Sequence, residues 1–203
     1  RGGQMNLPNK LTLSRIILIP FFIAAFYAPF TCHYFVALGI FAIASITDFF
    51  DGKIARKRNL VTDLGKFLDP IADKVLVTSA IVVMVADPNA NVFTSVLGNM
   101  LGLMLGGIGV VIIIARELVV SSLRMMAAKQ GKVLAAEYIG KVKTFFTDVT
   151  LVVVLLASGL YEFSDTAGRI TAIIALVGFG ISVLLTIISG VSYLVKNKEV
   201  FAE

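Results

Sequence analysis

Length, composition and charge exclude a soluble protein. The chain has 203 residues, of which 58% are hydrophobic and only 15% are charged, and its mean hydropathy is +0.92. A soluble domain carries about 25% charged residues. The net charge of +5 does not indicate nucleic acid binding, because the basic residues lie beside apolar runs rather than along a polar groove. A single cysteine, Cys32, excludes an intramolecular disulfide.

The first residues predict a short helix at the membrane surface. Arg1 to Gln4 precede Met5 and look like the remnant of a cloning vector. Asn9, Thr12 and Arg15 recur every three residues, which places them on one side of a juxtamembrane helix. Pro8 fits a helix start with Asn9 as its cap. Taken alone, these residues slightly favour capping and anchoring at the membrane surface.

The rest of the chain predicts six transmembrane helices in one domain. Apolar runs suited to crossing a hydrocarbon core are expected at residues 11–28, 35–48, about 65–86, 96–116, 145–160 and 170–194. Pro20 is expected to kink the first. Either Asp69 caps the third, with Pro70 in its first turn, or Pro70 kinks it. No polar linker divides the chain, so the expected fold is one all-α transmembrane domain over residues 5–203.

The distribution of lysine and arginine predicts the orientation. Residues 29–34 and 87–95 contain no lysine or arginine, whereas the 49–68 and 124–143 segments each contain five. Loops rich in Lys and Arg stay in the cytoplasm. We therefore expect a multi-pass protein of the inner (cytoplasmic) membrane, with both termini and the acidic cluster described next on the cytoplasmic side.

Two pairs of aspartates flank the 49–68 segment. Asp48 and Asp51 are three residues apart, and Asp69 and Asp73 are four apart. On helices, each spacing puts both carboxylates on one face. Two helices joined by a short connection usually lie antiparallel as neighbours, so both pairs can face one gap. For a single pair, the simpler explanation would be solvated charges at the membrane interface that flank two helices.

Four carboxylates around one gap predict a site for hard divalent cations. At ~4 Å and an effective dielectric of ~20, each pair of like charges costs about 4 kcal/mol. Oxygen ligands relieve this cost by binding magnesium, manganese or calcium rather than zinc. Two Mg²⁺ ions, or Mn²⁺, could bridge these carboxylates and clamp substrate phosphates. Gly52, Ala55 and Gly65 leave room for a bulky anion. The guanidinium of Arg56 offers several N–H donors arranged to match a phosphate group.

The complete pattern D-x2-D-G-x2-A-R-x8-G-x3-D-x3-D resembles the CDP-alcohol phosphotransferase family. It is formed by Asp48, Asp51, Gly52, Ala55, Arg56, Gly65, Asp69 and Asp73. Further resemblance lies in N-K-L-T-L-S-R, in A-R-E at 115–117 and in G-K-V-K-T at 140–144, and it covers the chain from Met5 onward.

The resemblance implies transfer of a phosphatidyl group from CDP-diacylglycerol to an alcohol, with release of CMP, by a homodimer. Asp48, Asp51 and Asp69 would bind the metals, and Asp73 would act as general base and share one ion. Gly52, Ala55, Arg56 and Gly65 would cradle the cytidine diphosphate. The resemblance also favours Asn9, Thr12 and Arg15 at the lip of the active site, where they would contact substrate phosphate.

Charges at the end of the fourth apolar run indicate the acceptor. Arg116 and Glu117 end V-V-I-I-I-A-R-E, and ions at membrane depth usually mark function, although Arg116 could simply extend to the headgroups. Arg124, Lys141 and Lys143 could converge with Arg116 in a cationic pocket. Such a pocket suits glycerol 3-phosphate, the acceptor of related enzymes, better than an uncharged alcohol. A cardiolipin-forming or inositol-phosphate-using relative would share the aspartates.

Several alternatives stay open on the sequence. An intramembrane prenyltransferase also uses paired aspartates and magnesium, but with its motifs far apart in the chain. A divalent-cation transporter usually has internal repeats, which this chain lacks. Gly98, Gly102 and Gly106 permit close helix approach, within one chain or across a dimer. Asp148 could pair with a lysine or tune the pocket.

Overall fold

The regular structure of the chain is helical over the residues described. The computed structural model describes residues 7–58, 63–87, 92–132, 134–135 and 137–200, with their side chains except those of 7–11, 48–58, 63–70 and 73. The elements are α1 (Leu7–Phe26), α2 (His33–Arg58), α3 (Asp63–Ala86), α4 (Val92–Leu97), α5 (Asn99–Lys129), α6 (Tyr138–Tyr161), α7 (Asp165–Lys196) and a 3-10 helix, η1 (Lys198–Val200).

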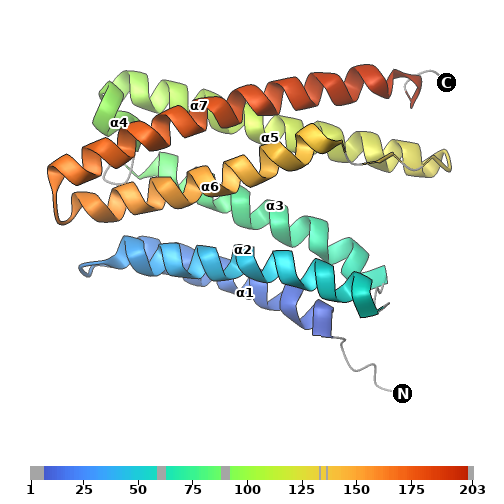
Figure 1. The fold of residues 1–203 in the computed structure, drawn as a ribbon, viewed down its shortest axis with the longest axis horizontal. Helices are drawn as coiled ribbons and strands as arrows, with labels where there is room; N and C mark the ends of the chain where they lie inside the picture. Colours follow the sequence, from blue (N-terminus) through green and yellow to red (C-terminus); the bar gives the residue numbers. More distant parts are fainter. Residues whose placement is uncertain (1–6, 59–62, 88–91, 133, 136, 201–203) are drawn as a thin grey trace.

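The long helices run roughly side by side in a bundle (Figure 1). α1 packs along α2 and α3, while α6 packs along α7, and α5 contacts α7. α2 also contacts α6, which joins the two groups of helices. The start of α1 and the end of α7 lie at the same end of the bundle, on the right in Figure 1.

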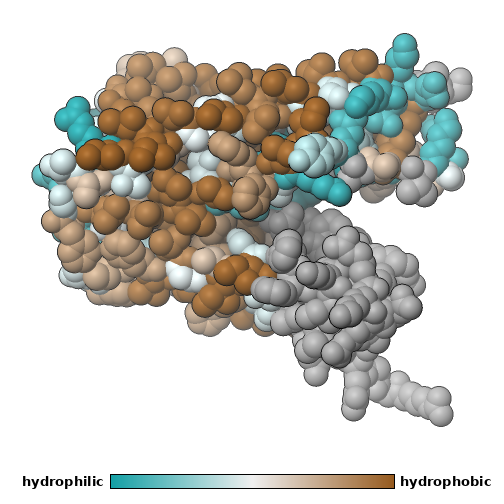
Figure 2. All heavy atoms as spheres, in the orientation of Figure 1, coloured by the Kyte–Doolittle hydropathy of each residue, from teal (hydrophilic) through white to brown (hydrophobic). Residues whose placement is uncertain are grey.

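The surface of the bundle is apolar, as the composition predicts. Hydrophobic side chains cover much of the face seen in Figure 2, and polar ones gather toward its ends. In the described part of the chain, α5, α6 and α7 are long and apolar enough to cross a membrane. Shorter apolar segments lie within α1, α2 and α3, at Thr12–Phe26, His33–Thr47 and Lys74–Ala86. Aromatic rings such as Phe22, Phe26 and Phe41 are buried between the first helices.

Several helix boundaries differ from the expected ones. The juxtamembrane helix and the first span are one helix, α1, so Asn9 lies within its first turn rather than at its cap. α2 continues past Asp48 to Arg58, because Lys53 to Arg58 are mostly good helix formers. α3 begins at Asp63, so Pro70 lies well inside it. Of the two alternatives for this region, the one in which Asp69 caps the helix is therefore excluded.

A break at Gly98 divides the predicted fourth span into α4 and α5. Gly98 has a φ of 83°, which a residue with a side chain rarely adopts. The turn folds α4 back onto α5, where a Cβ on Gly102 would lie 2.5 Å from the carbonyl carbon of Phe93. Gly106 faces the Phe93 ring. Gly102 and Gly106 therefore serve packing within one chain.

We expect Gly102→Ala to destabilise the protein, because its new methyl group would press on the Phe93 backbone, which cannot move aside as a side chain could. Overpacking of this kind costs about 1–3 kcal/mol. Gly107→Ala is the matched control, since no atom lies within 4 Å of its Cβ position. Thermal unfolding in detergent should show a lower midpoint for Gly102→Ala alone. Equal midpoints for the two variants would contradict the close contact.

Candidate active site

The two aspartate pairs lie on neighbouring helices. Asp48 and Asp51 belong to α2, Asp69 and Asp73 belong to α3, and the two helices contact each other. The helical spacing of each pair is thus confirmed, whereas their side chains lie outside the described ones, so a shared gap stays a prediction. Gly52, Ala55 and Arg56 on α2, and Gly65 on α3, lie in the same stretches, where the helices are described but the side chains are not.

The chemistry of these residues fits a divalent cation. All four aspartates would offer carboxylate oxygens, the ligands that magnesium and manganese prefer. Among the side chains that the structure describes, His, Cys, Asp and Glu form no group of three that could hold a metal. The aspartates predicted as the donor set, on α2 and α3, lie outside those side chains.

Lys74 ties the acidic helix to α5, and the sequence analysis missed it. Its ammonium donates a hydrogen bond to the Ser121 hydroxyl, which in turn donates to the Glu117 carbonyl oxygen at 2.6 Å. Lys74 follows Asp73 directly, at the start of the apolar part of α3. A lone cation beside an apolar run was the available signal.

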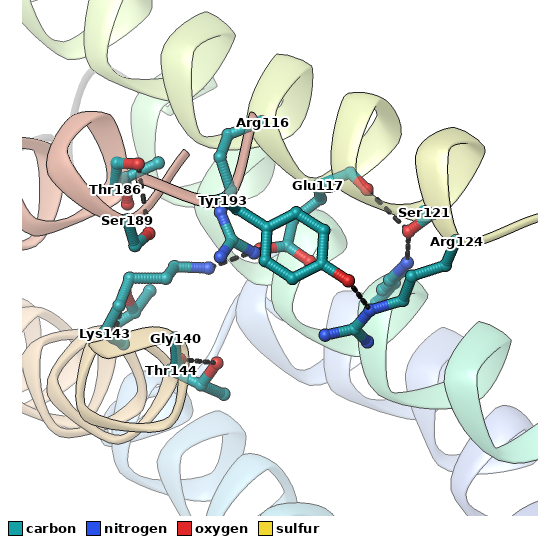
Figure 3. Close-up of polar contacts among 12 residues, drawn as sticks. Arg116, Glu117, Ser121, Arg124, Gly140, Lys143, Thr144, Thr186, Ser189 and Tyr193 are labelled. Carbon is teal, nitrogen blue, oxygen red and sulfur yellow. Dashed lines mark hydrogen bonds and ion pairs between the residues drawn. The ribbon is translucent and has the colours of Figure 1, made fainter. Parts of the chain in front are cut away.

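A compact ion cluster joins α5 to α6. One oxygen of Glu117, Oε1, accepts hydrogen bonds from Arg116 Nη1 at 3.0 Å and from Lys143 Nζ at 2.5 Å. The Lys143 side chain is only 5% exposed, against 13% for Arg116 and 24% for Glu117. Figure 3 shows both cationic side chains directed at the same carboxylate. Such short bonds between ionised groups are the strong ones.

Two glycines make room for Arg116 between the helices. A Cβ on Gly190 of α7 would lie 3.1 Å from Arg116 Cγ, and a Cβ on Gly140 of α6 would lie 3.4 Å from Nη2. The guanidinium Nε is buried without a hydrogen-bond partner among the described residues. Arg116 is therefore directed into the bundle rather than extended toward the headgroups.

The other predicted cations lie differently. Arg124 donates from Nε to the Tyr193 hydroxyl at 3.1 Å, and its guanidinium carbon lies 5.4 Å from the centre of the Tyr193 ring. Tyr193 is fully buried on α7. Lys141 is exposed and, in the described part of the structure, makes no side-chain bond to the cluster. Arg116 and Lys143 are thus brought together, Arg124 lies two turns along α5, and Lys141 lies apart.

Comparisons with known proteins identify the family. A profile of the CDP-alcohol phosphatidyltransferase family matches residues 5–188. The chain is 37% identical, over 97% of both chains, to the CDP-diacylglycerol–glycerol-3-phosphate 3-phosphatidyltransferase of Bacillus subtilis (strain 168). It is 44% identical, over 70% of this chain and 71% of the other, to the protein of the same name from Escherichia coli (strain K12). The chain belongs to the CDP-alcohol phosphatidyltransferase family.

In this phosphatidyltransferase, two of the three predicted lip residues, Thr12 and Arg15, are buried. Thr12 and Arg15 lie on α1 with no exposed surface, and Arg15 is among the largest fully buried side chains. Their burial is inconsistent with simple anchoring at the membrane surface. An arginine inside an apolar bundle usually has a function or pairs with another buried polar group. The Asn9 side chain lies outside those described.

An apolar cleft of about 620 Å³ lies between α2 and α6. Ala42 and Ser45 line it from α2, and Phe145, Asp148 and Val149 line it from α6. The cleft reaches α2 within one turn of Asp48 in the chain. Asp148, whose role the sequence left open, therefore lies in the wall of an apolar cleft beside the aspartate-bearing helix.

Proposed function

We propose that this phosphatidyltransferase transfers the phosphatidyl group of CDP-diacylglycerol to sn-glycerol 3-phosphate, giving phosphatidylglycerophosphate and CMP. The names of the relatives from B. subtilis and E. coli support this reaction, one of them over nearly the whole chain. The observation that carries the choice of acceptor is the cationic cluster of Arg116 and Lys143. A phosphate monoester needs such cations, whereas an uncharged alcohol does not.

The donor is expected to bind through its diphosphate. Asp48, Asp51, Asp69 and Asp73 would hold two magnesium ions, and manganese could replace them. When bound, the ions supply charge neutralisation to the diphosphate as the bond to CMP breaks. Gly52, Ala55, Arg56 and Gly65 would surround the cytidine diphosphate, with Arg56 supplying donors to phosphate oxygens.

The acceptor would be held and deprotonated by the chain's own side chains. Arg116, Arg124, Lys141 and Lys143 would attract its phosphate, and Asn9, Thr12 and Arg15 would contact substrate phosphate from α1. Asp73 would take the proton from the attacking hydroxyl. The Lys74–Ser121 hydrogen bond supports a short separation between this helix and the cations of α5.

The membrane arrangement matches this pair of substrates. Six apolar segments support a six-span, single-domain protein of the inner membrane, and the lysine and arginine pattern supports cytoplasmic termini and active site. The cleft between α2 and α6 would take an acyl chain of the donor, since it is apolar and approaches Asp48. The family resemblance supports a homodimer.

The acceptor assignment is tested with purified protein in detergent, CDP-diacylglycerol and magnesium. We expect CMP release with glycerol 3-phosphate, and little with inositol phosphate, phosphatidylglycerol or the uncharged alcohols choline and inositol, because only the first combines a small size with the charge that the cluster requires. Chelation by EDTA should abolish turnover, and added Mg²⁺ or Mn²⁺ should restore it. CMP release that prefers another acceptor would refute the assignment.

Asp73→Asn should remove turnover while the protein stays folded. Loss of a general base lowers the rate about 10²- to 10⁴-fold. The matched control is Asp165→Asn, an exposed aspartate in the first turn of α7, which should keep its activity. CMP release and thermal unfolding are measured on both. Near-normal turnover by Asp73→Asn would exclude it as the base.

Ala42→Trp should obstruct the cleft and weaken binding of the lipid donor. We expect the KM for CDP-diacylglycerol to rise about tenfold, equivalent to ~1.4 kcal/mol, with the KM for glycerol 3-phosphate unchanged. Val111→Trp, at a lipid-exposed position on α5, controls for the added indole. Equal donor KM values for the two variants would place the acyl chain elsewhere.

A further inference from the structure

We propose that Glu117 is a positioning residue for acceptor recognition, which acts by holding the side chains of Arg116 on α5 and Lys143 on α6 together. The proposal deepens the proposed function and rests on it. In the sequence, Glu117 stands out only as the neighbour of Arg116. A negative charge in a site for an anionic substrate requires an explanation. The explanation lies in what its carboxylate binds.

A single carboxylate oxygen joins cations from two helices. Glu117 Oε1 accepts from Arg116 on its own helix and from Lys143 on α6, at 3.0 and 2.5 Å. Two cationic groups that both lie this close to one oxygen atom would repel each other if the anion between them were absent. Glu117 therefore allows the two positive side chains to lie close together inside the bundle (Figure 3).

Burial makes this partner necessary for Lys143. Its side chain is 5% exposed, so water cannot solvate the ammonium fully, and burying a charge without a counterion is costly. Glu117 is the counterion that the described structure provides. Without it, the Lys143 side chain would turn away toward water, which would move its positive charge away from an acceptor phosphate.

The backbone of Glu117 is also held in place. Its carbonyl oxygen accepts the Ser121 hydroxyl at 2.6 Å, and Ser121 accepts from Lys74 of α3. Arg116 is confined in turn by Gly140 and Gly190. Contacts from α3, α6 and α7 thus surround this part of α5. They hold the Glu117 carboxylate in place, and so it can set where the two cations lie relative to Asp73 on α3.

The test compares Michaelis constants of full-length variants in detergent by CMP release. Glu117→Gln should raise the KM for glycerol 3-phosphate about tenfold and leave the KM for CDP-diacylglycerol within about twofold of the unmodified protein. Because Glu117 acts through Lys143 as well as Arg116, the double variant Glu117→Gln/Lys143→Gln should raise the acceptor KM by clearly less than the product of the two single effects. Purely structural damage would instead change both KM values or turnover alone.

The control variant is Glu137→Gln. Glu137 precedes α6 and pairs with Lys196 at 3.1 Å, so this variant also removes a glutamate charge from an ion pair, but one that includes neither Arg116 nor Lys143. Its KM for glycerol 3-phosphate should not change. If Glu117→Gln does not fold, Glu117→Asp replaces it. The shorter carboxylate keeps the charge but withdraws from Lys143, and the acceptor KM should rise about threefold.

An unchanged acceptor KM in folded Glu117→Gln, or in Glu117→Asp where the first variant does not fold, would overturn the proposal. A lowered acceptor KM would also overturn it, because it would mean that the carboxylate competes with the phosphate. So would effects of Glu117→Gln and Lys143→Gln that multiply in the double variant. Failure of the proposed function is distinguishable, because the unmodified protein would then release no CMP with glycerol 3-phosphate.

Discussion

The pairing of buried charge in an apolar bundle is the constraint on which the candidate site depends. Lys143 and Arg116 are largely removed from water, and Glu117 accepts hydrogen bonds from both. Leaving one of these cations without its partner costs several kcal/mol, more than most single packing contacts contribute. The cluster therefore links α5 to α6 through side chains, at the place where the proposed function puts the acceptor phosphate.

Small residues make this arrangement possible. Helices that bury a guanidinium between them must leave space for it, and Gly140 and Gly190 provide that space on either side of Arg116. Two glycines on α5 itself serve a different purpose, because Gly102 and Gly106 let α4 approach closely. The same residue type thus builds tight apolar packing at one end of α5 and accommodates a cation further along the helix.

The sequence predicted the elements whose signals are local. Apolar runs located the helices, and the spacing of Asp48 and Asp51, and of Asp69 and Asp73, placed each pair on a helix. Arg116 stood out as a charge ending an apolar run. The break at Gly98 was missed because hydropathy continues across it and only the positive φ reveals it. Lys74 was missed because its partner, Ser121, lies on another helix, 47 residues away.

α6 contributes residues both to the apolar cleft and to the ion cluster, the two sites that the proposed reaction would use. Successive residues turn by about 100° around a helix, so Phe145, Asp148 and Val149, which line the apolar cleft, lie about 140–240° from Lys143. Lys143 accordingly faces Glu117 on α5, while the cleft residues face α2. A lipid donor and an anionic acceptor would therefore approach opposite sides of this helix. In the proposed function, the two substrates would meet at the aspartates of α2 and α3.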